Sequence, residues 1–256
     1  MSRYGRFPLV SAAAVTNADL LLPALLGTLM LVPLLGFRLD IGLSALFYSP
    51  GEGFRLWHDW LLEKVLHDWV KEIVRAVVLL LALAAFSSLR MERLRPLRRL
   101  LWFVLLATLL AAAAVTAVKH TSLQTCPVGI DLFGGSEPYF SLLEPAPAGV
   151  RSGQCWPGGH AASAFSFFPL VFAARQMGRQ RLARGLFWFV MLFGFVLTMV
   201  QVARGAHFFS HQVWTALICW YASLAAYWLF FSFRHAERIR SGHGANIAPG
   251  SLQPLD

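Results

Sequence analysis

The sequence has few charged residues. They make up 14% of the 256 residues, whereas hydrophobic residues make up 57%. Soluble domains carry about a quarter charged residues, so this composition argues against an ordinary soluble domain and favours a membrane protein. The formal net charge of +9 is compatible with nucleic-acid binding, but the arginines form short clusters between apolar runs. Such clusters are typical of membrane topology, and we therefore predict a membrane protein with no nucleic-acid partner.

Other common signatures are also missing. The three cysteines do not form a metal-type cluster, and we find no internal repeat. Residues 1–20 contain no clear signal-peptide cleavage pattern, so we expect the first apolar run to be retained as a span. A short polar segment with Gly and Pro ends the sequence, and residues 241–256 are predicted to be a cytoplasmic tail.

Apolar runs of about twenty residues predict an all-α fold with six transmembrane helices in a single domain over residues 1–256. The fourth run is short and contains Pro169. The predicted spans are Leu20–Phe37, Glu72–Leu89, Leu100–Val118, His160–Ala174, Gly185–Val202 and Phe208–Phe233.

Every second connection between these spans is rich in arginine. Because basic residues collect on the cytoplasmic side of a membrane, the pattern places both termini in the cytoplasm. We therefore predict a multi-pass protein of the cell inner membrane. The clusters are Arg3 and Arg6; Arg90, Arg93, Arg95, Arg98 and Arg99; Arg175, Arg179, Arg181 and Arg184; and Arg234, Arg238 and Arg240.

The remaining connections are expected on the outer face. Within Arg38–Lys71, the apolar positions from Phe54 to Trp69 have helical spacing and predict a helix in the membrane interface. The long connection Lys119–Gly159, with many Pro and Gly, predicts an irregular outer cap loop. Cys126 and Cys155 both lie in this loop, where they form either a disulfide, which we favour, or two reduced thiols.

Candidate functional residues gather at the outer ends of different spans. Each has an ordinary alternative: the lysine as a membrane anchor, the first histidine as a helix cap, and the last two histidines as a metal pair. Their convergence at one membrane level favours function, because charged and histidine side chains at membrane depth are costly. The candidates are Lys119; Gly158, Gly159 and His160; and Arg204, His207 and His211.

This set suits phosphoryl transfer. Lys119 and Arg204 neutralise phosphate oxygens, and the N–H groups of Gly158 and Gly159 approach them at a helix start. A neutral histidine attacks phosphorus, and a second histidine protonates the leaving oxygen. The design requires no metal and no cofactor.

With these residues in place, the pattern resembles the type 2 phosphatidic acid phosphatase superfamily. Its three motifs are written K-x6-R-P, P-S-G-H and S-R-x5-H-x3-D, and its membrane members have six spans. The corresponding segments here are Lys119–Pro127, Pro157–His160 and Arg204–His211, within roughly residues 100–233. The resemblance implies catalytic roles for His207, His160 and His211.

The segments depart from the family motifs in several places. Cys126 stands where the first motif has arginine, and Gly158 replaces the serine of the second. Gln201 stands where the third motif has arginine, and Arg204 lies one helical turn further on, from where it can reach the same phosphate. The groups considered as compensation are Arg151, His120, Thr121, Gln124 and the displaced Arg204.

His211 takes the place of the aspartate that orients the nucleophile in this family. An imidazole can accept that hydrogen bond but supplies no fixed negative charge. The favoured register makes His207 the nucleophile, because His207 and His211 keep the H-x3-D spacing. The alternative register makes His211 the nucleophile, seven residues after Arg204.

The resemblance implies a metal-independent lipid phosphatase with a phosphohistidine intermediate and a periplasmic active site. Its substrates would be lipids of the undecaprenyl diphosphate, phosphatidylglycerol phosphate or lipid A type. Alternatives are a lipid phosphotransferase, a lipid-binding or transport protein, and a catalytically inactive scaffold. The sequence does not select one of these lipids, and it does not predict the oligomeric state.

Overall fold

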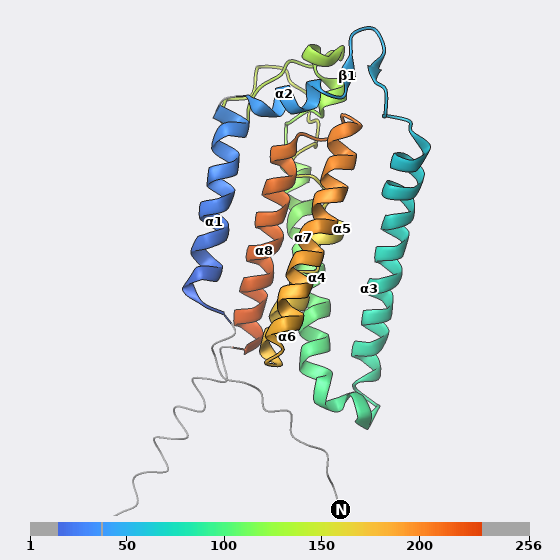
Figure 1. Ribbon diagram of the computed structural model, residues 1–256, viewed down its shortest axis with the longest axis vertical. Helices are drawn as coiled ribbons and strands as arrows, with labels where there is room; N and C mark the ends of the chain where they lie inside the picture. Colours follow the sequence, from blue (N-terminus) through green and yellow to red (C-terminus); the bar gives the residue numbers. More distant parts are fainter. Residues whose placement is uncertain (1–14, 37, 232–256) are drawn as a thin grey trace, which may run out of the picture.

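Long helices run side by side along one axis, and α2 and the small hairpin lie at one end of them (Figure 1). The computed structural model describes residues 15–36 and 38–231. The α-helices are α1 (Asn17–Leu31), α2 (Leu39–Ala45), α3 (Val70–Ser87), α4 (Arg98–Thr121), α5 (Ala162–Phe165), α6 (Pro169–Gln176), α7 (Gln180–Ala203) and α8 (Phe209–Phe231). Two π-helices, η1 (Val32–Gly36) and η2 (Leu61–Trp69), and three 3₁₀ turns, η3 (Glu92–Leu97), η4 (Pro127–Gly129) and η5 (Asp131–Phe133), complete the helical elements.

Strand is confined, in the described residues, to one small hairpin and one isolated bridge. The hairpin pairs β1 (Tyr48–Ser49) with β2 (Gly53–Phe54) in antiparallel register, and the bridge joins Ile130 to Glu137. The chain is thus helical at the level that the sequence predicted.

Four segments are long and apolar enough to cross a membrane: Asn17–Gly36, Glu92–Thr121, Gln180–Ala203 and Phe209–Phe231. Their outward faces expose large apolar side chains, including Leu21 and Trp188. Such extended apolar surface is unstable in water and suits lipid, so the chain is a membrane protein. Helix α3 carries Lys71, Glu72 and Arg75 in its first turns, and α5 and α6 are short.

The fourth predicted span is divided into two short helices. Pro169 has no N–H and its ring would clash with the carbonyl of Phe165, so a regular α-helix cannot continue through it. The chain tightens instead, and the N–H groups of Phe168 and Leu170 bind the carbonyls of Phe165 and Phe167, three residues back. Helix α6 then starts with Pro169 as its first residue.

The segment predicted as an interfacial helix also differs from its sequence pattern. Its first residues belong to the hairpin, because Phe54 pairs with Tyr48. Only Leu61–Trp69 is helical, and this π-helix runs without interruption into α3 at Val70. The apolar periodicity of this segment therefore belongs to an extension of α3.

Aromatic side chains fill the core between α4, α6 and α8. Phe103, Phe172 and Tyr227 lie in one cluster, with ring centroids of Phe103 and Tyr227 5.9 Å apart. The indole of Trp220 donates to the carbonyl of Asp19 at 2.8 Å and so connects α8 with α1. The Asp19 carboxylate pairs with Arg175 at 2.6 Å, which attaches α6 to the same place.

A second, smaller apolar cluster holds the short elements at the end of the bundle. It joins Phe54 of the hairpin, Ile130 and Phe133 of the segment after α4, and Phe208 between α7 and α8. The structure also joins Cys126 and Cys155 of that segment by a disulfide. The arginine-bearing turns between α3 and α4 and between α6 and α7 lie at the opposite end (Figure 1).

Because α7 packs closely on α5, one methyl group added to α7 at this contact should have a large effect on stability. A Cβ at Gly194 would lie 2.2 Å from the Phe165 ring, whereas a Cβ at Gly185, on the same helix, would meet nothing within 4 Å. Alanine favours a helix over glycine by about 0.5–1 kcal/mol, but overpacking costs about 1–3 kcal/mol. We expect Gly194→Ala to lower the thermal unfolding temperature in detergent and Gly185→Ala to maintain or raise it. Equal unfolding temperatures for the two variants would contradict this packing.

Candidate active site

The turn between α7 and α8 is built by a glycine with positive φ. Gly205 has φ +68°, and its N–H binds the carbonyl of Val202, while the N–H of Ala206 binds that of Gln201 at 2.9 Å. These two bonds form a Schellman motif, which ends α7 and turns the chain sharply. Arg204 and His207 therefore face the end of the bundle from within a tight, buried corner.

Arg204 and His160 are both held by main-chain oxygens of the segment that leads into α3. The Nε–H of Arg204 donates to the carbonyl of Trp57 at 3.1 Å, and its guanidinium lies over the Trp57 ring. Nε2 of His160 lies 2.9 Å from the carbonyl oxygen of Leu66, and since a carbonyl only accepts, Nε2 carries the proton. The His67 ring lies 4.5 Å from the His160 ring.

Gly158 is needed for packing. A Cβ there would lie 2.0 Å from the side-chain oxygen of Gln212, so a serine at this position would require the amide of Gln212 to move. The N–H of Gly158 donates to the carbonyl of His211 at 3.2 Å, and its own carbonyl accepts from the Thr215 hydroxyl at 3.0 Å. The N–H of Gly158, which the sequence predicted to bind phosphate, therefore already donates a hydrogen bond within the protein.

The side chain next to Gly158 was not singled out from the sequence. Gln212 is 1% exposed, and neither its amide nitrogen nor its amide oxygen has a hydrogen-bond partner. An orphaned buried amide is costly, and such groups are often functional or bound by a ligand. The one indication of its importance in the sequence is that Gln212 directly follows His211, the last residue of the third motif segment.

Lys119 approaches the other glycine of this turn. A Cβ at Gly159 would lie 3.7 Å from Lys119 Cδ and 3.9 Å from its Nζ. The charge of Lys119 also acts on His207, and the charge of Arg204 acts on His160. The structure thus brings Lys119, Gly159, His160, Arg204 and His207 into one electrostatic neighbourhood.

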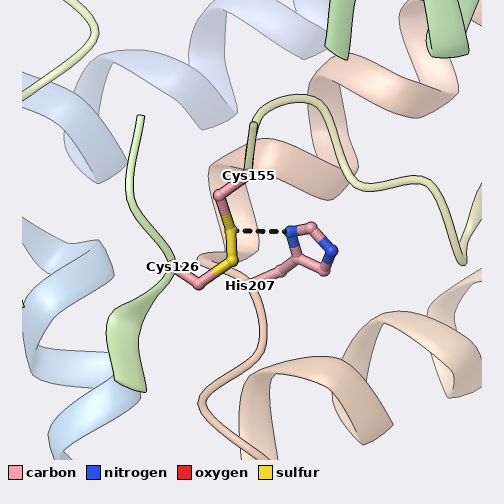
Figure 2. Close-up of side chains that lie close together, drawn as sticks. All are labelled: Cys126, Cys155 and His207. Atoms are coloured by element: carbon pink, nitrogen blue, oxygen red, sulfur yellow. Dashed lines mark hydrogen bonds between the residues drawn. A yellow bond between two sulfur atoms is a disulfide. The ribbon is translucent and has the colours of Figure 1, made fainter. Parts of the chain in front are cut away.

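His207 contacts the disulfide directly. Its Nδ1 lies 3.3 Å from Sγ of Cys155, and the second ring nitrogen points away from the two sulfurs (Figure 2). The rings of His207 and His211 are 5.9 Å apart at an interplanar angle of 69°, and Nδ1 of His211 is buried without a partner. The sulfur, rather than His211, is therefore the atom next to Nδ1 of His207.

His207 and His160, which both lie outside the helices, are neutral at pH 7. Burial, followed by repulsion from the protonated form of His211 and from the charge of Lys119, holds the pKa of His207 well below its usual 6.5. Burial, followed by repulsion from the protonated form of His67, lowers the pKa of His160 to about 4. A neutral imidazole retains the lone pair that a nucleophile or a general base needs.

Cys126, Cys155 and His207 also have metal-ligand atoms within 4.8 Å of one another. The thiolate is the form of cysteine that binds metals, and a sulfur shared in a disulfide is not a thiolate. This group therefore does not fit a metal centre in its oxidised form.

Of the groups considered as compensation for the motif departures, Arg151 lies elsewhere. It binds Glu137 at 2.9 Å, and its side chain is exposed. His120 is exposed at the end of α4, and the Thr121 hydroxyl donates to its own helix at the carbonyl of Val118. Gln124 is buried in the segment that follows.

Comparison with known families gives one result. The family model described as the PAP2 superfamily matches residues 100–235, just over half of the chain. This range contains α4, the disulfide segment and α5 to α8, and so every candidate residue described above. Neither the comparison with curated proteins nor that with solved structures found a match.

The lowered pKa of His160 predicts acid sensitivity. The unfolded chain has the ordinary value of 6.5 and binds more protons than the folded protein between pH 6.5 and about 4. Stability is therefore lost as the pH falls through this window. Asp40 acts in the opposite direction, since burial raises the pKa of this carboxyl to about 6 while it accepts the Ser210 N–H.

We therefore expect His160→Gln to flatten the fall in unfolding temperature between pH 7 and pH 4.5 in detergent, and Asp40→Asn to steepen it. Scans at several pH values across this window measure both slopes. Parallel curves for the two variants would show that these groups do not govern the acid response.

Proposed function

The chain belongs to the PAP2 superfamily, and from this premise we propose that it is a metal-independent lipid phosphatase acting through a phosphohistidine on His207. One observation carries the proposal: the end of α4 with Lys119, the turn before α5 with His160, and the α7–α8 turn with Arg204 and His207 meet at one place, where His160, Arg204 and His207 are buried and Lys119 is half-buried. Family membership supports phosphoryl transfer in general. The reaction, the intermediate and the substrate below are our proposal.

In the first step, a ring nitrogen of His207 attacks phosphorus. A nitrogen–phosphorus bond forms, the bond from phosphorus to the lipid oxygen breaks, and the leaving oxygen takes a proton. His160 supplies that proton, because a bound phosphate favours the charged form of a nearby imidazole and raises its pKa. Water then attacks phosphorus and gives its proton back to His160, the nitrogen–phosphorus bond breaks, and inorganic phosphate leaves.

Three groups are placed to hold the phosphate. Lys119 supplies a point charge, and Arg204 supplies a planar fork that matches two oxygens. We add the amide of Gln212, which has no partner within the protein and takes the place of the missing serine hydroxyl. The carbonyls of Trp57 and Leu66 now occupy Arg204 and His160, so we propose that substrate oxygens displace them.

The arrangement in the membrane follows from the arginine clusters. We propose that α3 and the α5–α6 pair cross the membrane together with the four long apolar segments, which gives six spans. The arginine-bearing turns lie at the end opposite the candidate site (Figure 1). By the positive-inside rule, this supports an inner-membrane protein with cytoplasmic termini and a periplasmic site.

A site at the periplasmic face would be accessible to lipids of the outer leaflet of the inner membrane. The proposed substrate class is a lipid phosphomonoester or diphosphate, such as phosphatidylglycerol phosphate, undecaprenyl diphosphate or lipid A. The phosphohistidine can also be attacked by the hydroxyl of a second lipid in place of water, which would make the protein a lipid phosphotransferase. A phosphotransferase is therefore the second candidate function.

The central prediction concerns His207. Purified protein in detergent with EDTA should release phosphate from at least one of these three lipids, and His207→Ala should abolish release. His58→Ala serves as the matched control, because this histidine side chain is 80% exposed. Acid-labile labelling of the wild type by ³²P-lipid, absent in His207→Ala, would report the intermediate.

The other outcomes also discriminate. Undiminished release by His207→Ala would exclude it as the nucleophile and direct attention to His211. Labelling without phosphate release, followed by transfer to an added lipid alcohol, would favour the phosphotransferase. Loss of activity upon EDTA addition would contradict a metal-independent reaction.

If the amide of Gln212 takes the place of the motif serine, a serine at position 158 should be able to replace that amide. Gly158→Ser should lower kcat/KM, because the new Cβ collides with the Gln212 amide. Gln212→Ala alone should lower kcat/KM by roughly 10²–10³, the usual effect of losing one such donor. The double variant Gly158→Ser/Gln212→Ala should recover much of this loss, because the serine hydroxyl then has space and replaces the amide.

Gln180→Ala, on the exposed start of α7, is the control for an ordinary glutamine. A double variant no better than Gln212→Ala would refute the exchange.

A further inference from the structure

The Cys126–Cys155 disulfide contacts the reactive histidine as well as closing its loop. We propose that it is the positioning group of His207: Sγ of Cys155 accepts the Nδ1–H and directs the lone pair of Nε2 toward phosphorus. The inference rests on the proposed role of His207 as nucleophile. It assigns Cys155 as the residue that positions His207, and it requires the disulfide to be oxidised for activity.

The geometry selects one tautomer of His207. Its Nδ1 lies 3.3 Å from Sγ of Cys155, within the range of an N–H···S hydrogen bond (Figure 2). A disulfide sulfur carries no proton and can only accept. A neutral His207 with its proton on Nδ1 is therefore attracted to the sulfur, whereas the other tautomer would oppose two lone pairs. With Nδ1 protonated, the lone pair belongs to Nε2, which points away from the disulfide.

The sulfur is itself held in place. Cys155 is completely buried, and its Sγ lies 3.2 Å from the carbonyl oxygen of Ala206, the residue before His207. The N–H of Cys155 donates to the carbonyl of Gln124 at 2.9 Å, and the bond to Cys126 fixes the sulfur from the other side. An acceptor restrained in this way fixes the plane of the imidazole as well as its tautomer.

His211, the residue expected to orient His207, forms no hydrogen bond with it among the described residues. Nδ1 of His211 is buried without a partner, and the two rings are 5.9 Å apart. No carboxylate in the described residues forms a hydrogen bond or ion pair with His207. Orienting partners of a catalytic histidine are usually carboxylates or carbonyls. Here both neighbours of His207 come from Cys155: its main-chain carbonyl also forms a hydrogen bond with the imidazole, and its Sγ lies 3.3 Å from Nδ1.

Reduction should reverse the preference. A dithiol reductant transfers two electrons and two protons, and the disulfide becomes two thiols. The S–H of Cys155 can then donate to Nδ1, which stabilises the tautomer that has its proton on Nε2. That tautomer has no lone pair on the nitrogen that faces the substrate, so the reduced protein should form the phosphohistidine slowly.

The experiment compares two variants that both lack the disulfide. Cys126→Ala/Cys155→Ala removes the staple and the acceptor. Cys126→Ala/Cys155→Asp removes the staple but places a carboxylate beside Nδ1. Both are measured with the wild type for kcat, KM and the rate of ³²P labelling, with unfolding temperature in detergent as the measure of structural loss.

If the sulfur positions His207, the Ala variant should lose roughly 10- to 100-fold in kcat, the scale for losing a histidine's orienting partner. Its KM should stay within about twofold, because the phosphate ligands remain. The Asp variant should recover most of the kcat although it also lacks the disulfide. Dithiothreitol should inhibit the wild type and a Cys219→Ser control alike, and should leave the Asp variant unaffected.

Two results would overturn the inference. Unchanged kcat in the Ala variant would show that His207 does not need the sulfur. Equal losses in the Ala and Asp variants, in proportion to their unfolding temperatures, would reduce the disulfide to a loop staple. His207→Ala belongs to the same series: if it retains activity, the proposed function fails irrespective of the cysteine variants.

Discussion

Burial of nitrogen-bearing side chains at one end of the bundle is the constraint on which the rest of the site depends. His160, Arg204 and His207 are all buried, and taking such groups out of water is costly unless each finds a partner. Their partners are two carbonyl oxygens and a sulfur. These acceptors are neutral, so they satisfy hydrogen bonds without cancelling the positive charge of Arg204. The positive charge of Arg204 therefore still favours the binding of an anion in the folded protein.

Neutral partners have a second consequence. A hydrogen bond to a charged acceptor is about twice as strong as one to a neutral acceptor, so a phosphate competes well against the carbonyls of Trp57 and Leu66. Both carbonyls belong to the chain between the hairpin and α3, whose π-helix has no buried residue. The π-helix that carries the Leu66 carbonyl is therefore less deeply packed than the turns that carry His160 and His207. In the proposed reaction, substrate entry would move this π-helix more easily than those turns.

The sequence predicted the helical class and four of the segments that are apolar enough to span a membrane, because composition and run length are local properties. It also contained the proline that divides the fourth span. It did not predict the contact between His207 and Cys155, or that Gln212 fills the space beside Gly158. These depend on how α8 packs against the turn before α5, and no periodicity reports such packing. The hairpin was missed because the apolar residues of Phe54–Trp69 fit a helical period whether or not the chain is helical there.

The departures from the family motifs make physical sense in pairs. A side chain at position 158 would collide with the amide of Gln212 as it lies in the structure, and we propose that this amide supplies the polar group that the serine provides in the family motif. In the same way, cysteine instead of arginine at position 126 permits a disulfide to Cys155, and the sulfur of Cys155 lies beside Nδ1 of His207, with which His211 forms no hydrogen bond. Each departure thus lies next to the group that we propose replaces it. A site that had merely decayed would have no reason to gain partners at the two places where it lost them, and this pairing favours a rebuilt active site over an abandoned one.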